Sequence, residues 1–119
     1  MKHSDAVGGL SALGHEHRLA VYRLLVEAGA EGLSAGAIAD ALGVPPSSLT
    51  FHTQALLRAG LITQRRESRL LIYAADFPTM NALVAYLTEN CCGGMQSCTP
   101  VCKPEATAVA PVSKKRSRA

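Results

Sequence analysis

Between residues 34 and 74 the sequence carries two short helical patterns and then two β-prone runs, and this order constrains the fold more than any other feature. Ser34 is a suitable N-cap for a first helix over residues 35–42. A rigid turn at residues 44–46, which contains two prolines, precedes a second helix from about residue 47 to residue 59. The two patterns together predict a helix-turn-helix pair.

The two β-prone runs, residues 61–65 and 69–74, flank a polar turn and predict a β-hairpin. A helix-turn-helix pair followed by a hairpin is typical of a winged helix-turn-helix, in which the hairpin is called the wing. The second helix of such a pair enters the major groove of DNA. This fold class therefore predicts double-stranded DNA as a partner.

Two longer amphipathic patterns flank this unit. Apolar residues recur at helical spacing over residues 10–28 and 78–90, and predict two further helices. We expect a mainly α domain with one β-hairpin at residues 10–92, an N-terminal arm at 1–9 and a flexible, cysteine-containing tail at 93–119. The apolar stripes of the flanking helices exceed what so small a monomer can cover, which predicts a homodimer. Its two recognition helices would lie about 34 Å apart, matching a palindromic operator.

Positive charge is concentrated in two places. The formal net charge is +3, and residues 1–90 are close to neutral, so the excess lies in the tail. Within the domain, one short stretch holds Arg58, Arg65, Arg66 and Arg69. Such a cluster either binds a polyanion or is an ordinary solvated surface. The basic residues at 114–118 have two possible roles: they contact phosphates, or they only keep the end of the chain soluble.

Candidate DNA contacts lie on the second helix of the pair and on the wing. Hydroxyl and amide side chains bond base edges and phosphates, and a phenyl edge contacts the methyl group of thymine. The residues of these kinds on the helix are Ser47, Ser48, Thr50, Phe51 and Gln54. On the wing, Arg65, Arg66 and Arg69 would contact phosphates or the minor groove, with Arg66 and Arg69 as the main candidates. His52 shares the buried side with Leu49 and Leu56, so we expect it to pack or to form a hydrogen bond.

Three segments resemble the ArsR/SmtB family of metalloregulatory repressors. Residues 13–19 match its opening, L-x-x-x-x-R-L, residues 47–62 match its recognition-helix pattern, and residues 65–73 match its wing. Thr53 stands where the family usually has Leu, and Ser68 stands where the wing usually has Gly. The resemblance implies a transcriptional repressor that binds operator DNA as a dimer.

All four cysteines lie close together near the end of the chain, at Cys91, Cys92, Cys98 and Cys102. In this position they cannot form disulfide bonds that crosslink the preceding domain. Residues 1–14 lack a secretory signal, so we expect a cytoplasmic protein whose cysteines stay reduced. Thiolates are soft ligands, which favours binding of a soft metal or metalloid, or redox sensing, over structural crosslinking.

The Cys-Cys-x5-Cys spacing resembles a subset of ArsR repressors that bind As(III) after their last helix. This resemblance implies that Cys91, Cys92 and Cys98 bind As(III) as the inducer, with Sb(III) and organoarsenicals as further inducers. It assigns no role to Cys102. The alternatives are a repressor that responds to Cd, Pb or Zn, a thiol-redox switch, and an arsenic chaperone that does not bind DNA.

The histidines near the N-terminus raise the question of a zinc site. His15 and His17 are two residues apart and cannot share one face of a helix. The residues that form the zinc and cysteine sites of the family's best-known sensors are also absent from the corresponding helices. We therefore expect no zinc role for His3, His15 and His17.

The sequence also argues against two classes of protein, enzymes and membrane-spanning proteins. It contains no defensible Ser/His/Asp arrangement and no glycine-rich phosphate loop, so we do not expect an enzyme. No apolar run approaches the roughly 18 residues that a membrane-spanning helix needs.

Overall fold

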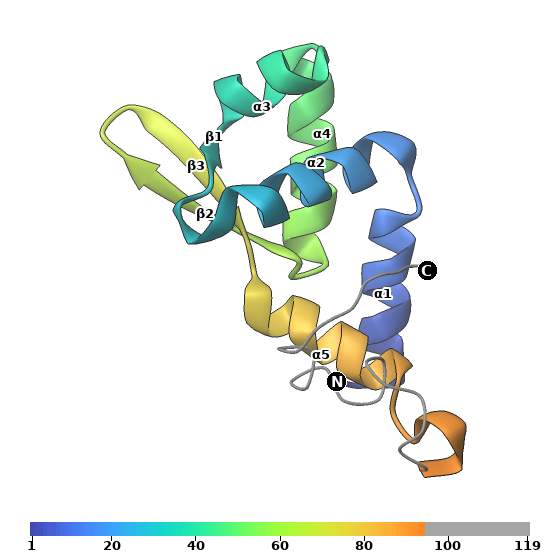
Figure 1. Ribbon diagram of the computed structural model, residues 1–119. Helices are drawn as coiled ribbons and strands as arrows, with labels where there is room; N and C mark the ends of the chain where they lie inside the picture. The colour runs from blue at the N-terminus through green and yellow to red at the C-terminus, as the bar shows by residue number, and fades with distance from the viewer. Residues whose placement is uncertain (95–119) are drawn as a thin grey trace, which may run out of the picture. The chain divides into compact units, whose positions relative to one another are not determined.

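The computed structural model describes residues 1–94 of the 119-residue chain, which divides into two compact units, residues 1–83 and 84–119. Its helices are α1 (His3–Leu13), α2 (Glu16–Ala28), α3 (Ala35–Leu42), α4 (Pro46–Arg58) and α5 (Phe77–Leu87), with 3-10 turns η1 (Gly29–Glu31) and η2 (Cys91–Gly94). Its strands are β1 (Leu33–Ser34), β2 (Ile62–Glu67) and β3 (Leu70–Ala75) (Figure 1). The predicted fold class, mainly α with a β-hairpin, is confirmed.

The helix-turn-helix pair consists of α3 and α4. The hydroxyl Oγ of Ser34 accepts a hydrogen bond from the backbone N–H of Ala37 over 3.1 Å, as expected of an N-cap. Gly43 ends α3 in the left-handed conformation with φ 67°, and α4 begins at Pro46. Both helices therefore begin and end within about one residue of their predicted limits.

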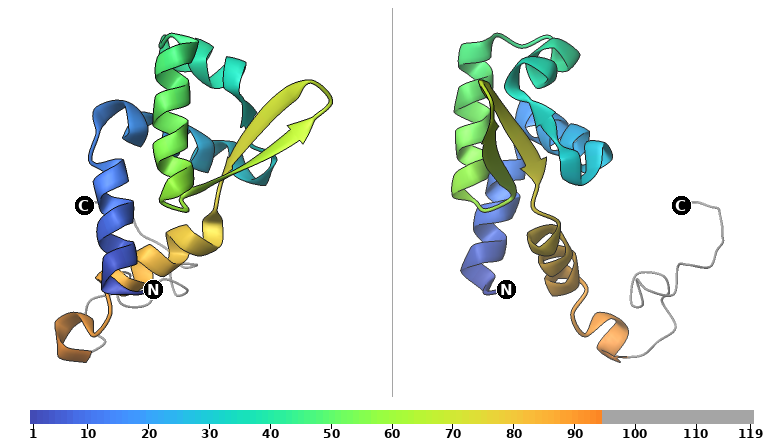
Figure 2. Two further views of the ribbon diagram at one scale, coloured as in Figure 1. Left: turned by 180° about the vertical axis from the view of Figure 1, so that it is seen from behind. Right: turned by 90° about the vertical axis from the view of Figure 1, so that its left-hand side faces the viewer.

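The wing is formed by β2 and β3, which pair antiparallel from Ile62 opposite Ala75 to Glu67 opposite Leu70. Only two residues connect the strands, and the first of them, Ser68, adopts φ 58°. A serine thus occupies a conformation that glycine adopts more readily. Both figures of the fold show the hairpin extending away from α2, α3 and α4 (Figures 1 and 2).

A third strand, which the sequence did not predict, completes the sheet. The two residues of β1 pair with β3, so that the strand order is β1-β3-β2. Before β1, Gly32 has φ 72°, and a Cβ atom at this position would overlap the carbonyl oxygen of Tyr73. Glycine is therefore required where the chain passes from α2 and η1 into the sheet.

The N-terminal region differs from the prediction of a single helix over residues 10–28 preceded by an arm. Most of the expected arm is helical, because α1 begins at His3. The chain then leaves the helix after Leu13, and His15 is extended, with φ −132° and ψ 133°. The Nδ1 atom of His15 accepts a hydrogen bond from the backbone N–H of His17 over 3.2 Å, so His15 is the N-cap of α2.

The core lies between α2, α3, α4 and the sheet. Its most deeply buried side chains are Val21, Leu25, Ile38, Thr53, Leu56 and Leu61. Thr53 fits this apolar environment because its hydroxyl donates a hydrogen bond to the carbonyl oxygen of Thr50 over 3.1 Å. Its side chain therefore leaves no unpaired donor at a position where leucine was the expected residue.

Candidate functional site

The exposed face of α4 carries every helix residue that we expected to contact DNA. These residues are Ser47, Ser48, Thr50, Phe51 and Gln54. The phenyl ring of Phe51 is 60% exposed, and the guanidinium carbon of Arg18 lies 5.3 Å from its centroid. On the opposite face, Leu49, His52 and Leu56 are buried, as the apolar spacing predicted. The core thus holds α4 so that its polar side faces solvent.

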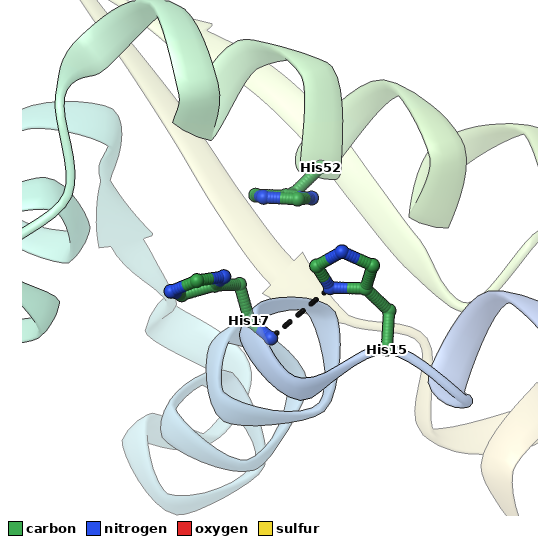
Figure 3. A group of neighbouring side chains, drawn as sticks. All are labelled: His15, His17 and His52. Carbon is green, nitrogen blue, oxygen red and sulfur yellow. Dashed lines mark hydrogen bonds between the residues drawn. The ribbon is translucent and has the colours of Figure 1, made fainter.

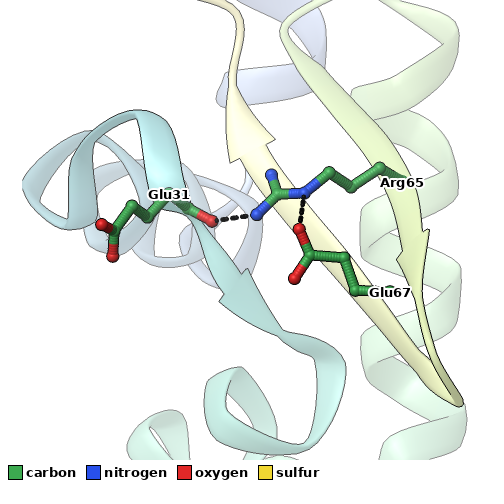
Figure 4. A network of polar contacts seen from close by, with 3 residues as sticks. All are labelled: Glu31, Arg65 and Glu67. Atoms are coloured by element: carbon green, nitrogen blue, oxygen red, sulfur yellow. Dashed lines mark hydrogen bonds and ion pairs between the residues drawn. The ribbon is translucent and has the colours of Figure 1, made fainter.

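The arginines of the wing have two different environments. Nε of Arg65 donates to a carboxylate oxygen of Glu67 over 2.8 Å, and Nη2 donates to the backbone carbonyl of Glu31 over 2.8 Å (Figure 4). Among the residues that the structure describes, neither Arg66 nor Arg69 makes a side-chain hydrogen bond or an ion pair. Both are exposed, so they are the wing cations that remain available to a phosphate. Contact with DNA stays a prediction for each of these residues.

Three histidines lie close together, although the sequence did not predict that they form a common site. One candidate ligand atom from each of His15, His17 and His52 lies within 4.8 Å of the other two (Figure 3). The premise that His15 and His17 lie on one helix was wrong, because His15 precedes α2 instead of lying within it. The signal available in the sequence was Gly14 before His15, a place where a helix can stop and restart.

His52 is the buried member of this histidine cluster. Burial is the largest cause that lowers the pKa of its imidazole, and His15, Arg18 and His17 lower the pKa further because a second positive charge beside them is unfavourable. Its Nδ1 atom is buried without a hydrogen-bond partner among the described residues. Of the two expected roles, packing or hydrogen bonding, the burial of His52 agrees with packing.

The described part of the cysteine cluster is a pair of adjacent thiols in η2. The Sγ atoms of Cys91 and Cys92 are 3.5 Å apart, and Cys92 has φ 57°. The hydrogen bond with Cys92 raises the pKa of the Cys91 thiol, and desolvation and the charge of Cys92 raise it further. The structure thus brings together two of the three expected arsenic ligands. The third, Cys98, and the unassigned Cys102 lie outside the described residues.

Comparison with known proteins agrees with this geometry. A family described as a helix-turn-helix domain matches residues 13–65. The HTH-type transcriptional regulator YgaV of Escherichia coli (strain K12) is 29% identical over 88 residues, which is 74% of this chain and 87% of YgaV. The structure of an ArsR-like transcriptional regulator from Rhodococcus sp. RHA1 is 25% identical, with a TM-score of 0.64 over 74% of this chain and 79% of that one. The chain is a DNA-binding transcriptional regulator with a winged helix-turn-helix domain, and it is similar to ArsR-like regulators.

A second similar structure confirms the fold of the regulator. A winged helix-turn-helix domain from Mycobacterium bovis, described as homodimeric, has a TM-score of 0.58 at 24% identity and covers 80% of this chain and 88% of its own. The descriptions of these proteins all refer to transcriptional regulation or DNA binding, and none refers to an enzyme. Among the residues that the structure describes, no helix has both the length and the apolar character needed to span a bilayer.

Proposed function

We propose that the regulator is a cytoplasmic, homodimeric repressor that binds operator DNA and is released from it by As(III). The observation that carries the DNA-binding part is the exposed polar face of α4 beside two wing arginines, Arg66 and Arg69, that make no side-chain ion pair in the described chain. In this proposal α4 enters the major groove, where Ser47, Ser48, Thr50, Phe51 and Gln54 contact bases or phosphates. Arg66 and Arg69 contact phosphates beside the groove.

Exposed apolar residues support a homodimer. On α1, Val7 and Leu10 are 49% and 44% exposed, and on α5 Val84 and Leu87 are 46% and 57% exposed. Large apolar side chains grouped on one element are typical of surfaces that another subunit covers. The Mycobacterium bovis domain, with which this chain shares its fold, is described as homodimeric.

The adjacent thiols of Cys91 and Cys92 support the choice of inducer. Soft, thiophilic centres bind sulfur ligands, and two sulfurs 3.5 Å apart can bind one such centre together. Trivalent arsenic forms a three-coordinate pyramid, for which Cys98 supplies the third thiolate. Binding would draw the chain after Asn90 back towards the pair, and a change in dimer geometry would couple this movement to DNA affinity by about 1–3 kcal/mol.

A gel-shift titration tests the proposed function. The full-length protein is bound to promoter DNA from its own gene, and As(III), Sb(III), an organoarsenical, Cd(II), Pb(II) and Zn(II) are added in turn under reducing conditions. Release by trivalent arsenicals at the lowest concentration is the expected result. Release only by a divalent metal or only by an oxidant would favour the metal-responsive or redox alternative. Absence of any retarded band would favour the chaperone.

A further inference from the structure

We propose that His15, His17 and His52 bind a divalent transition-metal ion, such as Zn²⁺, between the start of α2 and the buried side of α4. One candidate ligand nitrogen from each ring lies within 4.8 Å of the others (Figure 3). The ring of His52 is 4.7 Å from that of His15 and 5.4 Å from that of His17, centroid to centroid. This site is separate from the cysteines and has a different ligand chemistry.

The nitrogens lie within 4.8 Å of one another, farther apart than they would be around a bound ion. Tetrahedral zinc with Zn–N bonds of about 2.0–2.1 Å requires ligand nitrogens about 3.3 Å apart. The side chains of His15 and His17 are exposed and can rotate, whereas His52 is fixed in the core. Small rotations of the two exposed rings towards the buried one therefore complete three ligand positions. A water molecule or another ligand would occupy the fourth.

The buried histidine provides a second, independent indication of a ligand. His52 is only 7% exposed, and its Nδ1 atom has no hydrogen-bond partner in the described chain. Buried polar atoms in folded proteins are nearly always satisfied by a hydrogen bond, a water molecule or an ion. Binding of the ion by Nδ1 of His52, together with the two neighbouring imidazoles, would satisfy this atom.

The chemistry of the site favours zinc, nickel or copper over arsenic. Three neutral imidazoles suit these borderline metals, whereas trivalent arsenic requires thiolates. A neutral imidazole has one nitrogen with an available lone pair, and in His15 that nitrogen, Nδ1, accepts the N–H of His17. Binding of a metal by His15 therefore replaces the N-cap hydrogen bond of α2, and the ion itself would then link the start of α2 to α4.

The test uses full-length protein in which Cys91, Cys92, Cys98 and Cys102 are all replaced by serine, so that thiols do not contribute to metal binding. Co²⁺ is followed by its visible absorption, and Zn²⁺ binding is measured by calorimetry. We expect one ion per chain. His15→Asn removes an imidazole but retains an N-cap acceptor, and His17→Gln changes an exposed side chain, so both variants are expected to fold.

We expect His15→Asn and His17→Gln each to weaken Zn²⁺ binding by at least tenfold. His3→Asn, which changes the fourth histidine of the chain outside this cluster, is the matched control and should bind as the parent does. Circular dichroism verifies that each variant is folded. Failure of the parent to bind one equivalent of either ion, or parental affinity in either cluster variant, would overturn the proposal. Neither result bears on arsenic, because the parent lacks the proposed arsenic ligands.

Discussion

Arg65 and Glu31 join the wing to the segment that follows α2. The guanidinium Nη2 of Arg65 donates to the backbone carbonyl oxygen of Glu31 over 2.8 Å, although the two residues are 34 positions apart in sequence. The same guanidinium also pairs with Glu67 on its own strand. Arg65 therefore links the middle of β2 to the segment after α2, whereas its neighbour Arg66 is exposed.

Replacing Arg65 by glutamine should lower the free energy of unfolding by about 1 kcal/mol, because one exposed, charge-assisted hydrogen bond and one exposed ion pair are lost. Urea denaturation measures this change. Arg69→Gln is the matched control and should leave stability within about 0.5 kcal/mol of the parent. Equal effects of the two substitutions would show that the contact with Glu31 does not stabilise the wing.

Arg66→Ala and Arg69→Ala should weaken binding to all DNA sequences alike. Each phosphate contact that is lost should reduce the slope of log affinity against log salt concentration by about 0.9. Fluorescence anisotropy with a labelled duplex at several salt concentrations measures the slope. If the slope stays at the parental value in both variants, the wing does not contact phosphates.

Gly32→Ala should destabilise the protein by more than about 2 kcal/mol. A positive φ alone costs a non-glycine residue about 1–2 kcal/mol, and the added Cβ would also overlap the carbonyl oxygen of Tyr73. Gly36→Ala provides the contrast, because Gly36 lies within α3 with no atom within 4 Å of the new methyl group. The free energy of unfolding of the Gly36→Ala variant should rise by about 0.8–1 kcal/mol, because alanine has a higher helix propensity than glycine. Thermal and urea unfolding of the two variants would contradict this interpretation if both moved in the same direction.

The cysteine variants provide the most direct test of the inducer site. Cys91→Ser, Cys92→Ser and Cys98→Ser should each bind operator DNA as the parent does and lose most of their response to As(III), because a serine hydroxyl does not replace a thiolate on a soft centre. Cys102→Ser should respond almost normally. The measurement is the As(III) concentration that releases half of the DNA.

X-ray absorption gives an independent count of the arsenic ligands. Three sulfur neighbours are expected around bound arsenic. Four sulfurs around a divalent metal, together with a Cys102→Ser variant as defective as the others, would indicate a tetrahedral metal site and contradict the arsenic assignment.

The elements best predicted from the sequence are those with local signals at both ends. Ser34 and Gly43 mark the limits of α3, and Pro46 marks the start of α4, because capping and proline geometry depend on only a few neighbouring residues. The break at Gly14 was missed because a single glycine is tolerated inside a helical pattern. The strand β1 was missed because two residues are too few to show alternation.

The candidate sites differ in the same way. The exposed face of α4 followed from helical spacing alone, since the buried positions of one helix define its solvent side. The histidine cluster depends on how closely α4 approaches the start of α2, and no pattern within residues 10–28 reports the distance to His52. Tertiary contacts of this kind are visible only in the folded chain.

Ser34 takes part both in the sheet and in the start of α3. Its backbone pairs with Ile72 in the sheet that carries the wing, and its hydroxyl caps the first turn of α3. Ser34 therefore gives the hairpin and the helix-turn-helix pair a direct covalent link, in addition to the packing of α3 and α4 against the sheet. The wing and the helix-turn-helix pair would therefore contact a DNA duplex at a spacing that is set in part at Ser34.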